Sequence, residues 1–432
     1  MSSPVRLTVE DFGTLTDEQG HRVAVQKFTW QTSAGLKLCV LNLDAAIIEL
    51  CAPDRSWSSS ANVLLAADTL DEYLQLDPTL ACAAHFEQGW PMLTRNGLRQ
   101  NATGCRTVDL NRVWHSFVDE TRLHLSLVHK SPTTHHRSTF ATVTICVEAS
   151  NVVRIQYQTC CTSGGLYRLA HRLLFNLAGH DAGAAGAFEH VLQLNADSYV
   201  DERRNLRAAG EHFTDLRIAQ HLGLSLYKAR NEGLEGADGV RGIYSLNNAA
   251  QDGFAVRLIH TGSGRAMEMY CDFPWMHFST LDHLPAGERT IVPFYPREGI
   301  RRVSLVFDLE KLILSIVDGL EEETSSQQET QALEPSESED IKEDRQEMST
   351  YAPGRFVKND GFLIHPLACP FRAKAQENNG TDAGDIQPSP SPPNPCPAQA
   401  PVPFIGHVTL KFGICKPLSP EPTTEPPSAT VH

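Results

Sequence analysis

The residues best suited to proton transfer in this sequence are its 18 histidines, because imidazole both donates and accepts protons near neutral pH. His171 stands directly before Arg172 in the apolar segment HRLLFNLAG, and Asp282 and Glu288 follow the segment SGRAMEMYCDFPWMHF. Histidine and carboxylate side chains are the types that general acid and general base catalysis use. The sequence alone does not bring them together, and most other histidines are expected to be structural or exposed, including His85, His115, His180, His277 and His283.

No motif of another common chemistry occurs in the sequence. It contains no P-loop, no G-x-G-x-x-G, no G-x-S-x-G and no H-E-x-x-H. Its 11 cysteines are odd in number and show neither C-x-x-C nor the Cys/His spacing of a zinc site. We therefore expect no cofactor, no metal and no disulfide framework, with the cysteines as buried free thiols.

The net charge of −15 is concentrated in one segment of the chain. Residues Glu321 to Glu347 contribute about −9, from 11 Asp and Glu against two basic residues. The rest of the chain is mildly acidic, which argues against a nucleic-acid partner. The best apolar run, LEKLILSIV before Asp318, is half the length of about 20 residues that a membrane helix needs. Because the start SSPVRLTVEDFGT is polar, we expect no secretory leader, no membrane span and a cytoplasmic location.

Short alternating segments dominate the chain from Arg6 to about Leu314. They include VAVQKFTW, LKLCVLNL, LHLSLVH, ATVTICVEA, VVRIQYQT, FAVRLIHT and AMEMYCDF. Alternation with β-branched and aromatic residues indicates half-buried strands, and many such strands with few helical patterns predict an all-β sandwich or barrel. The segment ANVLLAADTLDEYLQL, residues 61 to 76, predicts one amphipathic helix from Asn62 to Leu76.

A change in composition after Gly319 predicts two parts, a sandwich domain over 1–318 and a mostly disordered tail over 319–432. The acidic stretch 321–347 has too little apolar surface to offset the entropy of ordering, and the Pro-rich stretch 385–403 predicts extended chain. Two segments of the tail differ in composition from these acidic and Pro-rich stretches. GFLIHPLACPF, from Gly361 to Phe371, is either a docked element or a loose apolar stretch. PFIGHVTLKFGIC, from Pro403 to Cys415, alternates like a strand that either packs back on the sandwich or stays loose.

Four segments of the sequence resemble motifs of a known protein family. Leu43 to Arg55 ends in P-D-R, and Asn62 to Leu74 has the form N-V-L-L-x-x-x-x-L-x-x-Y-L. LQLNADSYVDERRNLRAAGE, from Leu192 to Glu211, is similar to a strand L-x-I-x-A-D-x-Y that leads to T-G-E, and Ser263 to Phe278 is similar to S-G-R-x-L-E-V-Y-T-x-x-P-x-x-Q-F. In this order they resemble the aldose 1-epimerases, or galactose mutarotases. The resemblance implies the family's galactose-mutarotase-like β-supersandwich, with a sugar groove across one sheet.

The resemblance also implies a catalytic set, which this sequence replaces. In the family a C-terminal glutamate is the base, two histidines serve the ring oxygen, and an Asp and an Arg hold sugar hydroxyls. The motif N-H-S-Y-F-N-L-A-G corresponds to HRLLFNLAG with Arg172 at the histidine, and L-H-G-G corresponds to ATGC with Thr103 at the other histidine. Arginine is a poor acid because its pKa lies above about 12. His171 lies one position earlier, on the opposite side of a strand, and would substitute only after a register shift.

The remaining family motifs are also altered. Trp90, in AAHFEQGWPM, falls near the sugar-binding arginine and is either a stacking platform or a core residue. Arg241 of GVRG stands at the aspartate of G-F-D-H, and an alternative register places Asp238 there. The L-E-x-Q-x-x-P-D-A segment that carries the base is missing after Phe278, where Asp282 and Glu288 are the nearby carboxylates.

Three functions follow as hypotheses. The first is an aldose 1-epimerase-like carbohydrate-binding protein, catalytically impaired, with sugar-binding residues Trp90, Thr103, Arg172 and Arg241. Its ligand is a carbohydrate or, because guanidinium groups bind phosphate, a sugar phosphate. The second is an active epimerase that interconverts the α and β anomers of hexoses through a rearranged site with His171 and Glu288. The third is an interaction protein in which the C-terminal tail binds a protein partner.

Overall fold

The computed structural model describes most of the sandwich and two segments near the C-terminus. The described residues are 4–16, 20–57, 59–76, 80–87, 92–94, 97–99, 112–130, 138–161, 168–200, 206–234, 236–247, 253–284, 304–307, 312–315, 356–367 and 403–417. Among them, no helix has the length and apolar character needed to cross a membrane. Strands make up most of these residues, which confirms the all-β prediction.

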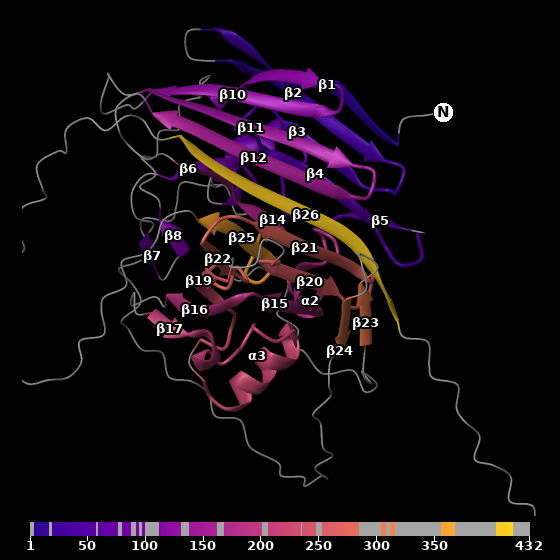
Figure 1. Cartoon of the computed structure of the whole chain (residues 1–432), viewed down its shortest axis with the longest axis vertical. Helices are drawn as coiled ribbons and strands as arrows, with labels where there is room; N and C mark the ends of the chain where they lie inside the picture. The colour runs from indigo at the N-terminus through magenta and orange to yellow at the C-terminus, as the bar shows by residue number, and fades with distance from the viewer. Residues whose placement is uncertain are drawn as a thin grey trace, which may run out of the picture.

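The largest sheet is antiparallel and runs through most of the molecule (Figure 1). Its strand order is β18 (Gln220–His221), β15 (His190–Leu194), β20 (Val256–His260), β21 (Arg265–Cys271), β26 (Phe404–Pro417), β12 (Val152–Cys161), β11 (Ser138–Glu148), β10 (Arg122–Lys130) and β9 (His115–Asp119). The hairpin of β23 (Ser304–Phe307) and β24 (Leu312–Ser315) joins it by pairing with β26. The strands predicted by alternation, such as those at β11 and β12, are confirmed.

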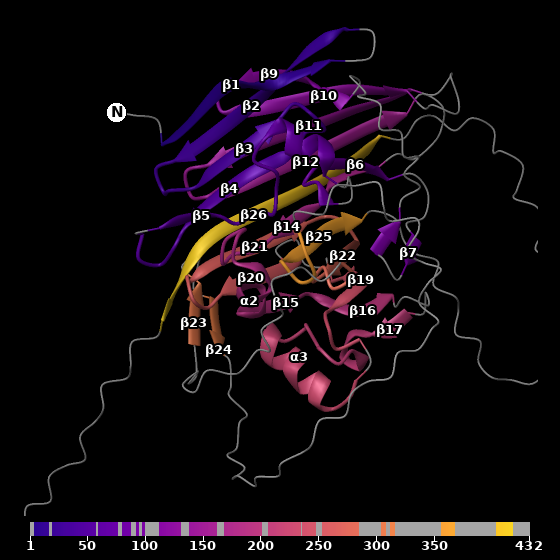
Figure 2. The ribbon, with the colours of Figure 1, turned by 180° about the vertical axis from the view of Figure 1, so that it is seen from behind.

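A second sheet of six strands carries the candidate site (Figure 2). Its order is β14 (Leu173–Phe175), β25 (Phe362–Leu367), β22 (Trp275–Ser279), β19 (Arg241–Leu246), β16 (Ala196–Val200) and β17 (Leu206–Ala208). A third sheet is formed in chain order by β1 (Val5–Thr16), β2 (Arg22–Thr32), β3 (Lys37–Leu41), β4 (Ile47–Pro53) and β5 (Ser60–Asn62). Two short ladders complete the strands, β6 (Ala84–Glu87) with β13 (Arg168–His171) and β7 (Met92–Thr94) with β8 (Gly97–Arg99).

Two strands from beyond residue 318 belong to the sandwich. β26 pairs with β12 on one side and with β21 on the other, so it lies inside the large sheet, in yellow in Figure 1. β25 lies between β14 and β22 in the six-stranded sheet. The strand predicted from Pro403 to Cys415 is therefore confirmed, and it packs back on the sandwich because the alternating residues Val408 and Leu410 are buried. The sandwich thus extends past the predicted boundary, while 321–347 and 385–402 lie outside the described residues.

The main core is made of the inward residues of these strands. In β11 the burial alternates with the pleat, so that Val143 and Ile145 are fully buried while their neighbours are partly exposed. Leu410 and Phe412 of β26 and Phe175 of β14 belong to the same cluster. Each fully buried side chain of this size contributes about 1.5–3 kcal/mol of hydrophobic free energy, so the late strands are a substantial part of the core.

The predicted helix from Asn62 to Leu76 is correct only in its second half. Residues 62–65 are extended, because Val63 N–H donates to Leu50 O at 2.8 Å and Leu65 N–H donates to Leu174 O at 2.9 Å. Consecutive apolar residues there are buried on both sides of the backbone, which an amphipathic helix does not allow. The helix α1 (Leu70–Gln75) begins after Thr69, whose side chain accepts from Glu72 N–H. Two other helices, α2 (Gly183–Phe188) and α3 (Leu222–Asn231), are not evident from the pattern.

Two of the family-like motifs meet at one buried arginine. Arg265 of the S-G-R turn is 4% exposed, and its guanidinium donates to Ala52 O at 3.0 Å and to Leu177 O at 3.1 Å. Arg55 of the P-D-R turn donates its backbone N–H to Ser263 O at 2.9 Å. Gly264 has φ +74°, and a Cβ there would lie 2.8 Å from the Cys415 carbonyl oxygen. These residues fix the turn that follows β14, and so they help to position that strand.

Candidate functional site

The predicted site begins at the junction of β13 and β14, where His171 and Arg172 point in opposite directions. His171 is fully buried, and its Nε2 donates to Ala45 O at 2.8 Å, so its Nδ1 accepts from the Tyr157 hydroxyl at 2.8 Å. Burial lowers the pKa of His171 to about 4. Both ring nitrogens are thus engaged in the core, and no register shift turns His171 toward the other side of the sheet.

Arg172 lies at the end of a row of side chains on the opposite face. Leu173 pairs with Ile364, which places Arg172 at the position opposite His365, and His365 pairs directly with His277. Opposed residues of paired strands share a face, so Arg172 of the segment before β14, His365 of β25 and His277 of β22 form one row. All three side chains are buried, with exposures of 2%, 0% and 0%. We call these three residues, with His85 of β6 and Arg241 of β19, the arginine–histidine cluster.

The histidines of this cluster are held in the neutral form. Burial lowers the pKa of His85, His277 and His365 well below the usual value, and the charge of Arg172 is the next largest cause in each case. Neither ring nitrogen of His277 has a hydrogen-bond partner among the described residues, and Nε2 of His85 has none there either. The cluster therefore combines a fixed positive charge with the neutral imidazoles of His277 and His85, which have unused hydrogen-bonding capacity among the described residues.

Arg241, the other predicted arginine, lies on the same face as the row. It pairs in register with Ser279, two residues from His277 on β22. Its Nη2 lies 3.7 Å from Oδ2 of Asp282, and the two side chains are 13% and 14% exposed. The alternative candidate, Asp238, is 64% exposed and ion-pairs with Lys358 at 3.1 Å. Of the two registers weighed for this motif, the structure thus brings Arg241, and not Asp238, to the cluster.

Three predicted site residues cannot be placed. Trp90, Thr103 and Glu288 lie outside the described residues, so their roles stay predictions. Two further histidines of the cluster, His277 and His365, are not among the site residues that the sequence predicts. A signal for His365 exists, because IHPLACPF from Ile364 has the spacing of L-E-x-Q-x-x-P-D, with Ile364 at the leucine, His365 at the glutamate and Pro370 at the proline. The segment described as missing is therefore matched here by spacing, with the carboxylate replaced by imidazole.

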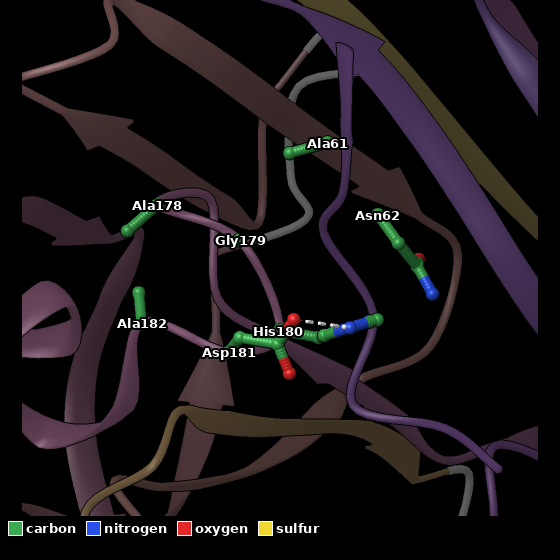
Figure 3. Close-up of a pocket in the computed structure, with 7 residues that line it drawn as sticks. All are labelled: Ala61, Asn62, Ala178, Gly179, His180, Asp181 and Ala182. Carbon is green, nitrogen blue, oxygen red and sulfur yellow. Dashed lines mark ion pairs between the residues drawn. The ribbon is translucent and has the colours of Figure 1, made fainter. Parts of the chain in front are cut away.

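A pocket of about 450 Å³ lies elsewhere, in the turn that follows β14 (Figure 3). It is lined mainly by alanine and glycine with Asn62, His180 and Asp181, and none of the cluster residues lines it. His180 Nε2 and Asp181 Oδ2 are 2.9 Å apart, so these two polar side chains of the pocket contact each other. The arrangement offers a ligand little besides small apolar side chains, and the arginine–histidine cluster is the better candidate site.

The buried neutral histidines predict a loss of stability in mild acid. Above pH 6.5 His171 is neutral in both the folded and the unfolded chain, and below it only the unfolded chain takes up the proton until about pH 4. His190 is also buried, with a lowered pKa, and behaves in the same way. Protonation linked to His171 should lower the free energy of unfolding by about 1.4 kcal/mol per pH unit between pH 6.5 and 4, and His190 acts in the same direction.

Urea unfolding at pH 7.5, 6.5 and 5.5 measures this dependence. In the variant His171→Gln the slope below pH 6.5 should be smaller by about 1.4 kcal/mol per pH unit. In the control Gln158→Ala, at an exposed side chain that carries no charge, the slope should be unchanged. A free energy of unfolding that is constant from pH 7.5 to 5.5 would contradict the assignment of neutral buried histidines.

Comparisons with known proteins agree with this architecture. No family model matches the chain. The galactose mutarotase of Sus scrofa is 24% identical over 296 residues, which span 64% of this chain and 82% of the relative, and that of Bos taurus is 23% identical over 295 residues. The solved galactose 1-epimerase from Lactobacillus acidophilus NCFM matches with a TM-score of 0.55 at 12% identity, over 94% of this chain and 98% of that one. The GalM/aldose epimerase homologue from C. elegans matches with a TM-score of 0.52 at 14% identity, over 88% and 97%.

The fold therefore defines the class of the protein, which is a galactose-mutarotase-like β-sandwich. The predicted β-supersandwich is confirmed. Together with the matches along the sequence, it confirms the predicted resemblance of this chain to the aldose 1-epimerases, as a divergent relative.

Proposed function

We propose that this protein is an aldose 1-epimerase-like carbohydrate-binding protein that has lost the acid and base of mutarotation. The observation that carries the proposal is the row of Arg172, His365 and His277 on one face of the six-stranded sheet. Arg172 stands at the family's histidine and is too weak an acid to protonate a ring oxygen. His365 stands at the family's glutamate. A sheet face with hydrogen-bonding groups and no carboxylate in the row is suited to holding hydroxyl groups rather than to the family's proton transfers.

The alternative of an active site rearranged around His171 has less support. Both ring nitrogens of His171 are bonded to the core residues Tyr157 and Ala45. A general base needs a nitrogen within hydrogen-bond reach of its substrate, and His171 has none to offer without breaking these bonds. Binding of a protein partner through the tail stays a prediction, because the acidic and Pro-rich stretches lie almost wholly outside the described residues.

Polarimetry of freshly dissolved α-D-glucose and α-D-galactose tests the proposal. The purified protein should leave the rate of mutarotation at its spontaneous value, because the described residues of the row provide neither the family's acid nor its base. A catalytic mutarotase measured in parallel shows that the assay would detect activity. Acceleration by the protein that disappears in the variant His365→Gln would contradict the loss of catalysis and would assign the base to His365.

A cytoplasmic location is also part of the proposal. Eight cysteines lie in the described part of the chain, and all eight are free thiols. Free thiols persist in reducing compartments, whereas oxidising compartments favour disulfides. This composition supports the cytoplasm as the site of action.

A further inference from the structure

We propose that the arginine–histidine cluster binds the phosphate of a phosphorylated sugar, with Arg172 and the ring nitrogens of His277 and His365 as its contacts. Binding is accompanied by uptake of protons by the cluster histidines. The inference rests on the proposed carbohydrate-binding function and assigns the ligand a charge. It also adds His277, His365 and His85 to the residues of the site.

The first support is the geometry of the sheet. The adjacent strands β25 and β22 bring His365 and His277 directly opposite each other, and Arg172 stands on the other side of His365. Neighbouring strands are about 4.8 Å apart, so the row from Arg172 to His277 spans about 10 Å. A phosphate group above His365 would therefore meet the guanidinium on one side and an imidazole on the other. Guanidinium binds phosphate through two parallel hydrogen bonds, which a neutral hydroxyl cannot reproduce.

The second support is the unused hydrogen-bonding capacity of a deeply buried side chain. His277 is 0% exposed, and both its ring nitrogens lack a partner among the described residues. Nε2 of His85 lacks one as well. A buried polar group without a partner is unfavourable and is uncommon in folded proteins. A phosphate supplies several strong acceptor oxygens and so satisfies protonated imidazoles in this position.

The third support is the balance of charge around the row. Among the described residues, the charged or titratable groups with the largest effect on the pKa of His277 are Arg172, His283 and Arg241, which are all basic. Those with the largest effect on the pKa of His365 are Arg172, His85, His277 and His171, which are also basic. In the described part of the chain, the carboxylate paired with this cluster is Asp282, which lies at Arg241. A dianion bound in the row would remove the unfavourable interaction with Arg172 and would raise the pKa of the histidines, so that they gain protons.

One partly exposed side of the cluster is the side of Arg241 and Asp282. Their side chains are 13% and 14% exposed, whereas Arg172, His277 and His365 are buried. A ligand that enters at Arg241 places its anionic end deep in the row. The sugar then lies nearer to the mouth, where Asp282 can accept hydrogen bonds from its hydroxyls.

Isothermal titration calorimetry of the full chain tests the inference. Glucose 6-phosphate and galactose 1-phosphate are titrated beside glucose, galactose and inorganic phosphate at pH 7.5, in two phosphate-free buffers with different ionisation enthalpies. At least one hexose phosphate should bind ten or more times tighter than its parent hexose and than inorganic phosphate. The measured enthalpy should differ between the buffers by the amount that proton uptake requires.

Variants assign the contacts. Arg172→Gln should weaken binding of the hexose phosphate by 100-fold or more, and by a much larger factor than it weakens binding of the parent hexose. His277→Gln should reduce the number of protons that the protein takes up when the hexose phosphate binds. Arg154→Gln and His407→Gln change exposed residues and should bind as the unaltered chain does. If Arg172→Gln does not fold, His277→Gln and the buffer comparison on the unaltered chain still decide the question.

Other results of the titration would overturn this inference, the identification of the ligand or the proposed function. Hexoses that bind as tightly as their phosphates would overturn this inference and leave the proposed carbohydrate binding intact. Inorganic phosphate that binds as tightly as the hexose phosphates would overturn the identification of a sugar ligand. If none of the five compounds binds, both the proposed function and this inference fail.

Discussion

A chain that ends at Val402 should fail to fold, because it lacks the strand that joins the two halves of the large sheet. β26 pairs with β12 on one side and with β21 on the other, and no other described strand bridges them. Its residues Val408, Leu410 and Phe412 are buried in the main core. Each contributes about 1.5–3 kcal/mol of hydrophobic free energy, and their sum approaches the entire stability of about 5–15 kcal/mol that domains possess.

Circular dichroism and size-exclusion chromatography of the truncated chain measure this effect. The matched control ends at Pro417, which keeps β26 and removes only the residues after it, and this control should give the spectrum and melting temperature of the full chain. A soluble monomer with an intact strand spectrum from the chain that ends at Val402 would mean that β12 and β21 can pair without β26.

The second large effect is expected at Arg265. The variant Arg265→Met keeps much of the side-chain volume but leaves the carbonyl groups of Ala52, Leu177 and Ala178 without the guanidinium that donates to them. Hydrogen bonds of charged groups contribute about 1.5–3 kcal/mol each, so the free energy of unfolding should fall by about 3 kcal/mol or more. Because Leu177 and Ala178 follow β14, the row that starts at Arg172 should also become less well ordered.

Urea unfolding monitored by tryptophan fluorescence provides the comparison for Arg265→Met. Arg154→Met is the control, since Arg154 is 57% exposed and its ion pair with Glu148 is a surface pair that contributes about 0–1 kcal/mol. A loss of stability at Arg265→Met that is no larger than at Arg154→Met would show that water replaces the guanidinium at these carbonyls.

The strands are predictable from the sequence because their alternation is local, but their partners are not. Alternation from Pro403 to Cys415 predicts β26, yet nothing within that segment specifies β12 and β21 as its neighbours, which lie far away along the chain. The run of apolar residues at Val63 and Leu65 fits a helix as well as a buried extended segment. The hydrogen bonds to Leu50 and Leu174, which are tertiary contacts, decide between the two.

The site residues also differ in whether the local sequence predicts them or only the pairing of strands places them. The motif around HRLLFNLAG places Arg172 in the site and His171 away from it, since neighbouring residues of a strand face opposite sides. His365 is harder to find because both the glutamate and the glutamine of its motif are replaced, and because a long segment separates it from β22. Only the pairing of β25 with β22 places His365 beside His277.

The position of β26 also affects synthesis of the chain on the ribosome. β12 ends at Cys161 and its partner begins at Phe404, which at about 5–20 residues per second is a delay of roughly 12–50 s. Until β26 is made, the edges of β12 and β21 that it later joins carry backbone N–H and C=O groups without their partner strand. Open strand edges of this kind readily pair with other chains. The nascent chain should therefore depend on chaperones until translation is nearly complete, and shortening that delay should raise the yield of folded protein.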